Sequence, residues 1–215
     1  MSQYWSTRFA REGMIWGDQP SPSALRAKAW FLEQGVQSVL VPGAGYGRNT
    51  KVFSSDLDTY GVELSRAALE LAADWDSQTR FIEGSALEPQ LDIRVDAVYC
   101  YDVLHLFLAG ERRQLIDASL AQLRPGGLLY FTSFSDEDSN NGHGRMLEPG
   151  TYEYKEGKYA HFFSDADLRE HFSAAEVVET GTFQELLQSP GGGTHEYLLR
   201  EIFARKRKEV YINRT

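Results

Sequence analysis

Short apolar runs alternate with helical patterns along most of the chain. The apolar runs predict five strands, at residues 38–42, 59–63, 79–82, 97–101 and 128–134. The segments between them are predicted helices, because their apolar residues recur at helical spacing. Strands that alternate with helices are typical of a doubly wound α/β fold, also called Rossmann-like, with a parallel sheet.

The pattern changes after Phe134. Residues 135–150 are polar and predict a long loop, which in a compact domain is usually functional or disordered. A hairpin is expected at 151–161, then a helix opened by a capping box at Ser164. Two final strands are expected near 176–183 and 194–204. The whole pattern predicts one seven-stranded, mostly parallel sheet with an antiparallel C-terminal strand.

Composition limits the classes that remain. The 215 residues suffice for one sizeable core, so we expect a single domain over residues 1–215. The formal net charge of −9 argues against nucleic acid as the main partner. Cys100 is the one cysteine, which excludes an intramolecular disulfide and a cysteine metal cluster. No stretch approaches the ~20 apolar residues of a membrane span, so we expect a cytoplasmic protein without a membrane partner.

The most informative stretch is residues 39–49, VLVPGAGYGRN. A strand runs into a glycine-rich turn, and a helix follows, which is how an α/β sheet brings its backbone close to a nucleotide-like ligand. The glycines follow G-x-G-x-G, because Arg48 stands where a dinucleotide fold has its third glycine. Glu63 ends the next strand, 20 residues after Gly43, where a carboxylate can bind ribose hydroxyls. The pair predicts an adenosine-containing ligand.

Three further motifs follow in order: FIEGSAL at 81–87, VDAVYCYDVLH at 95–105, and LRPGG at 123–127. Together with the glycine turn they resemble the class I S-adenosylmethionine-dependent methyltransferases, over roughly residues 36–134. Ser85 departs from the pattern, since the family usually has Asp there, and its hydroxyl would bond the adenine amine more weakly. The last motif resembles the family's L-x-P-G-G turn into the fifth strand.

The resemblance implies S-adenosyl-L-methionine as the cofactor. Arg48 could pair with its methionine carboxylate, or could sit exposed near Asp56 or Asp58. Tyr101 would lend its backbone to the methionine amine. The residues that the resemblance assigns to the cofactor site are Trp16, Gly43, Ala44, Gly45, Gly47, Arg48, Glu63, Leu64, Ser85, Ala86, Leu87 and Tyr101.

The amino-terminal segment gives a narrower resemblance. A tryptophan at position 5 and W-G-x-x-P-S at 16–21 are similar to small bacterial methyltransferases of the tellurite-resistance and thiopurine type. There the leading segment folds over the cofactor, which implies a lid at residues 1–22. The alternative is that Trp5, Phe9 and Trp16 simply pack on the first long helix. The resemblance also places the acceptor near the insertion at 135–163, with Trp5, Tyr46 and Arg145 as candidate substrate contacts.

Methyl transfer of this kind is an in-line displacement, in which the cofactor carries the reactivity and the protein supplies orientation and a dry site. It requires no metal and no nucleophilic side chain. A base helps only if the acceptor must lose a proton. His105 and His195 are the weak candidates, and for His105 a histidine packed against the sheet is the favoured alternative.

The acceptor stays open: a thiol, a chalcogen oxyanion-derived group or another small nucleophile. Two other functions compete with a small-molecule methyltransferase. One is a methyltransferase-like module that binds without turnover, and the other is a nicotinamide-dependent oxidoreductase, disfavoured by Arg48 and by the L-x-P-G-G turn. A nucleic-acid methyltransferase is weaker still. The sequence does not reach the oligomeric state.

Overall fold

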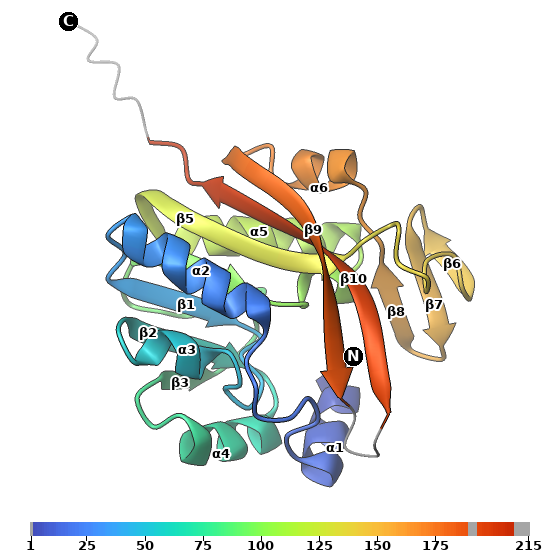
Figure 1. The fold of residues 1–215 in the computed structure, drawn as a ribbon, viewed down its shortest axis with the longest axis horizontal. Coiled ribbons are helices and arrows are strands. Elements are labelled where there is room, and N and C mark those ends of the chain that lie inside the picture. The colour runs from blue at the N-terminus through green and yellow to red at the C-terminus, as the bar shows by residue number, and fades with distance from the viewer. Residues whose placement is uncertain (1, 189–192, 209–215) are drawn as a thin grey trace, which may run out of the picture.

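A seven-stranded sheet forms the centre of the protein (Figure 1). The structure is a computed structural model that describes residues 2–188 and 193–208. The strand order is β3-β2-β1-β4-β5-β10-β9, in which β10 runs antiparallel to both neighbours. This confirms the predicted fold. The strands are β1 (Ser38–Pro42), β2 (Asp58–Glu63), β3 (Arg80–Glu83), β4 (Val95–Cys100), β5 (Leu123–Phe134), β9 (Glu176–Gln188) and β10 (Thr194–Arg205).

Helices cover both faces of the sheet and form two apolar cores. One core joins the sheet to α5 (Ala109–Gln122) and α6 (Asp165–His171), and the other joins it to α2 (Pro22–Glu33) and α3 (Thr50–Ser54). Helix α4 (Arg66–Trp75) packs beside α1 (Ser2–Glu12), where Phe9 and Ala68 share a third cluster. None of the described helices is both long and apolar enough to cross a lipid bilayer.

Serine side chains begin three of these helices. Ser21 accepts a hydrogen bond from the backbone N–H of Ser23, Ser65 from that of Ala68, and Ser164 from that of Asp167. Such caps satisfy N–H groups that have no partner within the helix. The cap at Ser164 is the helix start that the capping box predicts.

The boundary between α5 and β5 differs from the prediction. The predicted helix continues to Pro125-Gly126-Gly127, but α5 ends at Gln122 and β5 already begins at Leu123. The LRPGG motif is an irregularity within the strand, where the pairing with β4 shifts register. A Cβ at Gly127 would lie 2.9 Å from the carbonyl oxygen of Asp96, so the strands approach closely there.

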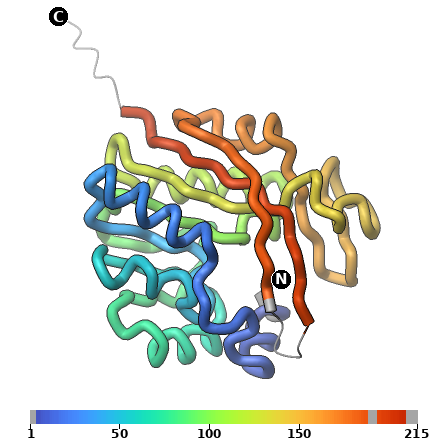
Figure 2. The backbone as a smooth tube through the Cα atoms, in the orientation of Figure 1, coloured from blue at the N-terminus to red at the C-terminus, as the bar shows by residue number. Residues whose placement is uncertain are grey.

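Part of the predicted 135–150 loop is a strand in the structure. Residues Arg145–Glu148 form β6, which pairs with β7 (Thr151–Lys155), and β7 pairs with β8 (Lys158–His161) in the predicted hairpin. Figure 2 follows the chain from the end of β5 into this small sheet and back to α6. The sequence did not indicate β6 because its side chains are partly or fully exposed, so it carries no apolar run.

Candidate functional site

The turn after β1 depends on glycine. Gly43, Gly45 and Gly47 have φ angles of 67°, 57° and 83°, which side chains with a Cβ rarely adopt. A Cβ on Gly43 would also lie 2.4 Å from Cγ2 of Val103. The N–H of Gly43 donates to the carbonyl of Val62, 2.8 Å away, which ties the turn to the end of β2.

Glu63 spans two backbone segments with its carboxylate. Oε2 accepts a hydrogen bond from the N–H of Gly45 at 2.9 Å, and Oε1 accepts one from Ser65 at 2.7 Å. Burial raises the pKa of Glu63, while these backbone hydrogen bonds act in the opposite direction. One carboxylate therefore holds the glycine turn and the start of α4 together.

A cavity of about 530 Å³ opens at this end of the sheet, within the range of ordinary small-ligand sites. All the predicted cofactor residues line it except Gly47, which faces Phe81 and Thr50 instead. Two of the three predicted substrate contacts, Trp5 and Tyr46, line it as well. The predictions from separate motifs therefore converge on one cavity.

Arg48 is buried, so the exposed alternative with Asp56 or Asp58 is wrong. Its side chain is 7% exposed, and Nη2 lies 3.6 Å from Oε1 of Glu185 on β9. The guanidinium also lies over the Tyr101 ring at 5.2 Å. Nη2 makes no hydrogen bond among the described residues. A buried cationic nitrogen with an open hydrogen-bonding position suits an anionic ligand group.

Sequence reasoning missed Asp102. It is the one described non-glycine residue with positive φ, at 54°. Its N–H donates to Oγ1 of Thr132 at 3.0 Å, and that hydroxyl donates to Oδ1 of Asp102 at 2.8 Å. Burial, and then the charge of Glu185, raise the pKa of Asp102 to about 7. The available signal was an acid directly after β4, at the carboxyl edge of a parallel sheet.

His105 both packs against the sheet and lines the cavity, so its surroundings support both roles that the sequence suggests. Its ring lies in a short 3₁₀ helix (Leu104–Leu106) and stacks on Phe134, with 3.9 Å between ring centroids. It also lines the cavity, and its Nδ1 is buried without a partner among the described residues. Burial lowers the pKa of His105 to about 3, so the imidazole is uncharged at neutral pH.

Two other candidate residues lie away from the cavity. His195 is exposed on β10 and stacks on Tyr197, so it does not reach the cavity wall. Arg145 is also exposed, and its guanidinium pairs with Glu153 across the small sheet at 2.6 Å. The structure therefore does not bring these two side chains to the cavity with the other candidates.

The amino-terminal aromatics pack on the glycine turn rather than on α2. Trp16 stacks on Tyr46, and Phe9 meets the same ring edge-on at 6.0 Å. The Tyr46 hydroxyl donates to the carbonyl of Gly17 at 2.7 Å and accepts from the N–H of Trp16. Trp5 completes the cluster against Trp16. The start of the chain therefore forms one wall of the cavity.

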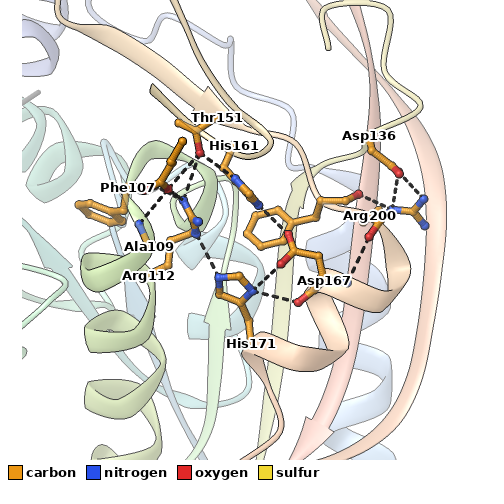
Figure 3. Close-up of polar contacts among 12 residues, drawn as sticks. Phe107, Ala109, Arg112, Asp136, Thr151, His161, Asp167, His171 and Arg200 are labelled. Carbon is orange, nitrogen blue, oxygen red and sulfur yellow. Dashed lines mark hydrogen bonds and ion pairs between the residues drawn. The ribbon is translucent and has the colours of Figure 1, made fainter. Parts of the chain in front are cut away.

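A buried polar network holds the small sheet beside the cavity (Figure 3). The carboxylate of Asp167 on α6 bonds Nε2 of His161 at 2.6 Å and lies 3.1 Å from Nδ1 of His171. Arg112 of α5 donates to Nε2 of His171, and Nδ1 of His161 bonds the hydroxyl of Thr151. The network joins β7 and β8 to both helices, and so fixes residues 151–161 in place.

Comparison with known proteins agrees with this geometry. Residues 40–131 match the family model described as "Methyltransferase domain". The search of curated proteins found no match.

Solved structures share the fold at low identity. One, from work on the conversion of a disulfide bond into a thioacetal group during echinomycin biosynthesis, is 16% identical with a TM-score of 0.76, covering 98% of this chain and 94% of its own. The 1,6-didemethyltoxoflavin N1-methyltransferase of Burkholderia thailandensis is 22% identical, with a TM-score of 0.69 and coverages of 96% and 87%. TehB from Haemophilus influenzae is 13% identical, with a TM-score of 0.65 and coverages of 96% and 67%. The chain therefore contains a methyltransferase domain over residues 40–131, and its fold is that of S-adenosylmethionine-dependent methyltransferases.

Proposed function

We propose that this protein transfers a methyl group from S-adenosylmethionine to a small-molecule acceptor held in the cavity at the glycine turn. The observation that carries the proposal is the carboxylate of Glu63, which lines that cavity while bonding the glycine turn. An acid in this position is what a ribose diol requires.

The residues present fit this cofactor. Glu63 would bind the ribose, the open Nη2 of Arg48 the methionine carboxylate, and the segment 85–87 the adenine. Tyr101 would supply its backbone to the methionine amine. The bound cofactor supplies an electrophilic methyl group. The protein's part is to orient the acceptor and exclude water, which together account for much of the rate enhancement in such reactions.

We also propose that residues 1–22 form a lid and that the insertion at 135–163 forms the acceptor side. Trp5 and Trp16 of the first segment, and Tyr154 and Tyr159 of the second, all line the cavity, which supports both assignments. The acidic balance of the chain supports a small molecule rather than nucleic acid as the partner. The buried free thiol of Cys100 suits the cytoplasm.

The test is a thermal-unfolding scan with S-adenosylmethionine, its demethylated product, or NAD. A ligand at ~100 times its Kd adds ~2.7 kcal/mol, or roughly 5–10 °C for a chain of this size. We expect a shift with the first two ligands only. Glu63→Gln should reduce affinity at least ~10-fold by calorimetry, because it loses the charge on the ribose acceptor.

The matched control is Glu83→Gln. Glu83 pairs in register with Glu63 at the end of β3, but it is exposed and lies outside the cavity. The Glu83→Gln variant should therefore bind S-adenosylmethionine as tightly as the parent protein. A shift with NAD alone would support the oxidoreductase instead. Binding without cofactor consumption, over a panel of thiol, chalcogen, amine and phenol acceptors, would support the non-catalytic module.

A further inference from the structure

The cavity continues beyond the predicted cofactor residues to a set of rings that we call the aromatic wall. These rings come from separate parts of the chain: the segment after the 3₁₀ helix, β5, the small sheet and β10. The aromatic wall consists of Phe107, Phe134, Tyr154, Tyr159 and Tyr197. Phe134 and Tyr197 are nearly parallel, with an interplanar angle of 13° and centroids 5.2 Å apart. A surface of this kind binds flat rings better than chains or small ions.

The charged groups near the aromatic wall already have partners. Nζ of Lys158 lies 3.5 Å from the centroid of the Tyr4 ring. The carboxylate of Glu111 accepts from the N–H of Leu108 at the start of α5. Arg8 pairs with Glu12 at 2.9 Å. Among these three described groups only Arg8 is neutralised by an opposite charge, so the rings rather than the charges decide which ligands this part of the cavity favours.

Three acids line the cavity, and two of them, Glu63 and Glu111, accept hydrogen bonds from backbone N–H groups. The carboxyl group of Asp102 is held instead by the hydroxyl of Thr132. Its left-handed backbone and its paired hydrogen bonds with Thr132 hold the carboxyl group in one orientation. Strained backbone of this kind is concentrated at functional sites. His105, which also lines the cavity, is uncharged, and its Nδ1 makes no hydrogen bond within the part of the chain that the structure describes. Asp102 is therefore the better proton acceptor and His105 the better hydrogen-bonding contact.

Building on the proposed function, we propose that the methyl acceptor is a planar aromatic or heteroaromatic molecule with an N–H or O–H nucleophile, and that Asp102 receives its proton. The acceptor's lone pair forms the new bond to the methyl carbon, the carbon–sulfur electron pair stays on sulfur, and the N–H or O–H proton passes to the carboxylate. No oxidant or reductant is needed. The ring of the acceptor lies against the aromatic wall.

The first experiment compares 2-naphthol with decahydro-2-naphthol, which has the same outline and hydroxyl but no aromatic ring. Affinities are measured by calorimetry on the full chain saturated with the demethylated cofactor product. We expect 2-naphthol to bind at least ~10-fold more tightly. Equal affinities, or tighter binding of the saturated alcohol, would overturn the proposal. Binding of the demethylated product is measured first. If the demethylated product does not bind, the proposed function is wrong. That outcome is distinct from a failure of the acceptor proposal alone.

Variants then locate the contact. Tyr154→Leu and Tyr197→Leu should each weaken 2-naphthol binding ~3–10-fold while leaving binding of the demethylated product unchanged. The matched control is Tyr152→Leu, two residues before Tyr154 on β7, because Tyr152 lies outside this cavity. If all three variants bind 2-naphthol as the parent protein does, the ring lies elsewhere and the proposal fails.

The role of Asp102 has its own readout, the pH dependence of 2-naphthol affinity between pH 5 and 9. An ionised carboxylate accepts the hydroxyl proton more strongly than a protonated one, so affinity should rise through about pH 7 in the parent protein. In Asp102→Asn that rise should vanish, and any turnover of 2-naphthol at pH 8 should fall ~100-fold or more. The same pH dependence in both proteins would show that Asp102 does not meet the hydroxyl.

Discussion

Two acids at the cavity differ in how much of their environment the sequence reveals. The sequence spacing between Glu63 and the glycine turn predicts that the two lie together, and in the structure the Glu63 carboxylate bonds that turn. Asp102 has no such spacing rule. Its importance depends on a positive φ and on a hydroxyl from the neighbouring strand β5, and neither can be read from the residues around it. Residue-level prediction therefore succeeded where a motif encodes the geometry, and failed where tertiary contacts create it.

The raised pKa of Asp102 makes a prediction about stability. The folded chain keeps its proton up to about pH 7, whereas an unfolded Asp loses it near 3.9. The group therefore stabilises the fold below pH 4, and this contribution is lost as pH rises through 7. Asp102→Asn should gain about 2–4 kcal/mol relative to the parent protein between pH 4 and 8, measured by urea unfolding. His105 titrates in both proteins, so its contribution cancels in the difference.

Asp96→Asn provides a comparison of opposite sign. Burial acts to raise the pKa of Asp96, but hydrogen bonds from Ser38 and Arg124 outweigh it and the pKa is lowered. That carboxylate therefore stabilises the fold above its unfolded pKa, so this variant should lose stability relative to the parent protein as pH rises from 3 to 6. If the unfolding free energies of Asp102→Asn and of the parent protein change with pH in parallel, the Asp102 carboxyl group is not buried and protonated as described.

At the scale of elements, apolar runs and caps predicted most of the central sheet. The strands near β1, β2, β4 and β5 are buried on both faces, so each appears in the sequence as a continuous apolar run. The strand β6 has no such run, since it is a partly exposed edge strand of the small three-stranded sheet. The early start of β5 was also missed, because a strand that passes through Pro-Gly-Gly contradicts local propensity. In both cases pairing with neighbours, rather than local pattern, decided the outcome.

The polar network around Asp167 holds the insertion in place, so removing the Asp167 charge should loosen strands β7 and β8. Burial acts to raise the pKa of Asp167, but hydrogen bonds from His161 and His171 outweigh it and hold the pKa well below its ordinary value. The carboxylate therefore stays ionised at neutral pH, and its contribution to stability is lost only in strong acid. Asp167→Asn should cost about 1–3 kcal/mol and speed amide hydrogen exchange in β7 and β8 at neutral pH.

Asp165→Asn is the matched control on the same helix. Asp165 is half exposed, and its partners Arg169 and Thr180 lie outside the small sheet, so its loss should cost no more than about 1 kcal/mol. Hydrogen exchange in the small sheet should stay at the parent rate. Equal effects of the two substitutions would mean that the network does not hold the insertion in place.

At the scale of the whole molecule, the cavity is closed by segments that are far apart in sequence. The long strands β9 and β10 extend together past the other strands toward α1 (Figure 1). On β9, Glu185 reaches both Arg48 and the hydroxyl of Ser21. The amino-terminal segment, the glycine turn and a C-terminal strand therefore meet at one buried ion pair. Sequence reasoning found Arg48 but not its partner Glu185, because that contact depends on where the last two strands join the sheet.

This ion pair gives the last prediction, a double-mutant cycle. Glu185→Gln leaves the Arg48 charge buried beside an uncharged group, which should cost about 3–5 kcal/mol. Arg48→Met should cost less, because burial already raises the pKa of Glu185 and the carboxyl can take up a proton. Since the two side chains share one interaction, the double variant should be more stable than the sum of single losses implies, by about 1–3 kcal/mol in chemical unfolding. Strictly additive losses would show that Arg48 and Glu185 do not depend on each other. Calorimetry separates the structural role of Arg48 from its proposed role in binding. S-adenosylmethionine should bind more weakly to Arg48→Met and also to the double variant, because both lack the proposed contact with the cofactor's carboxylate.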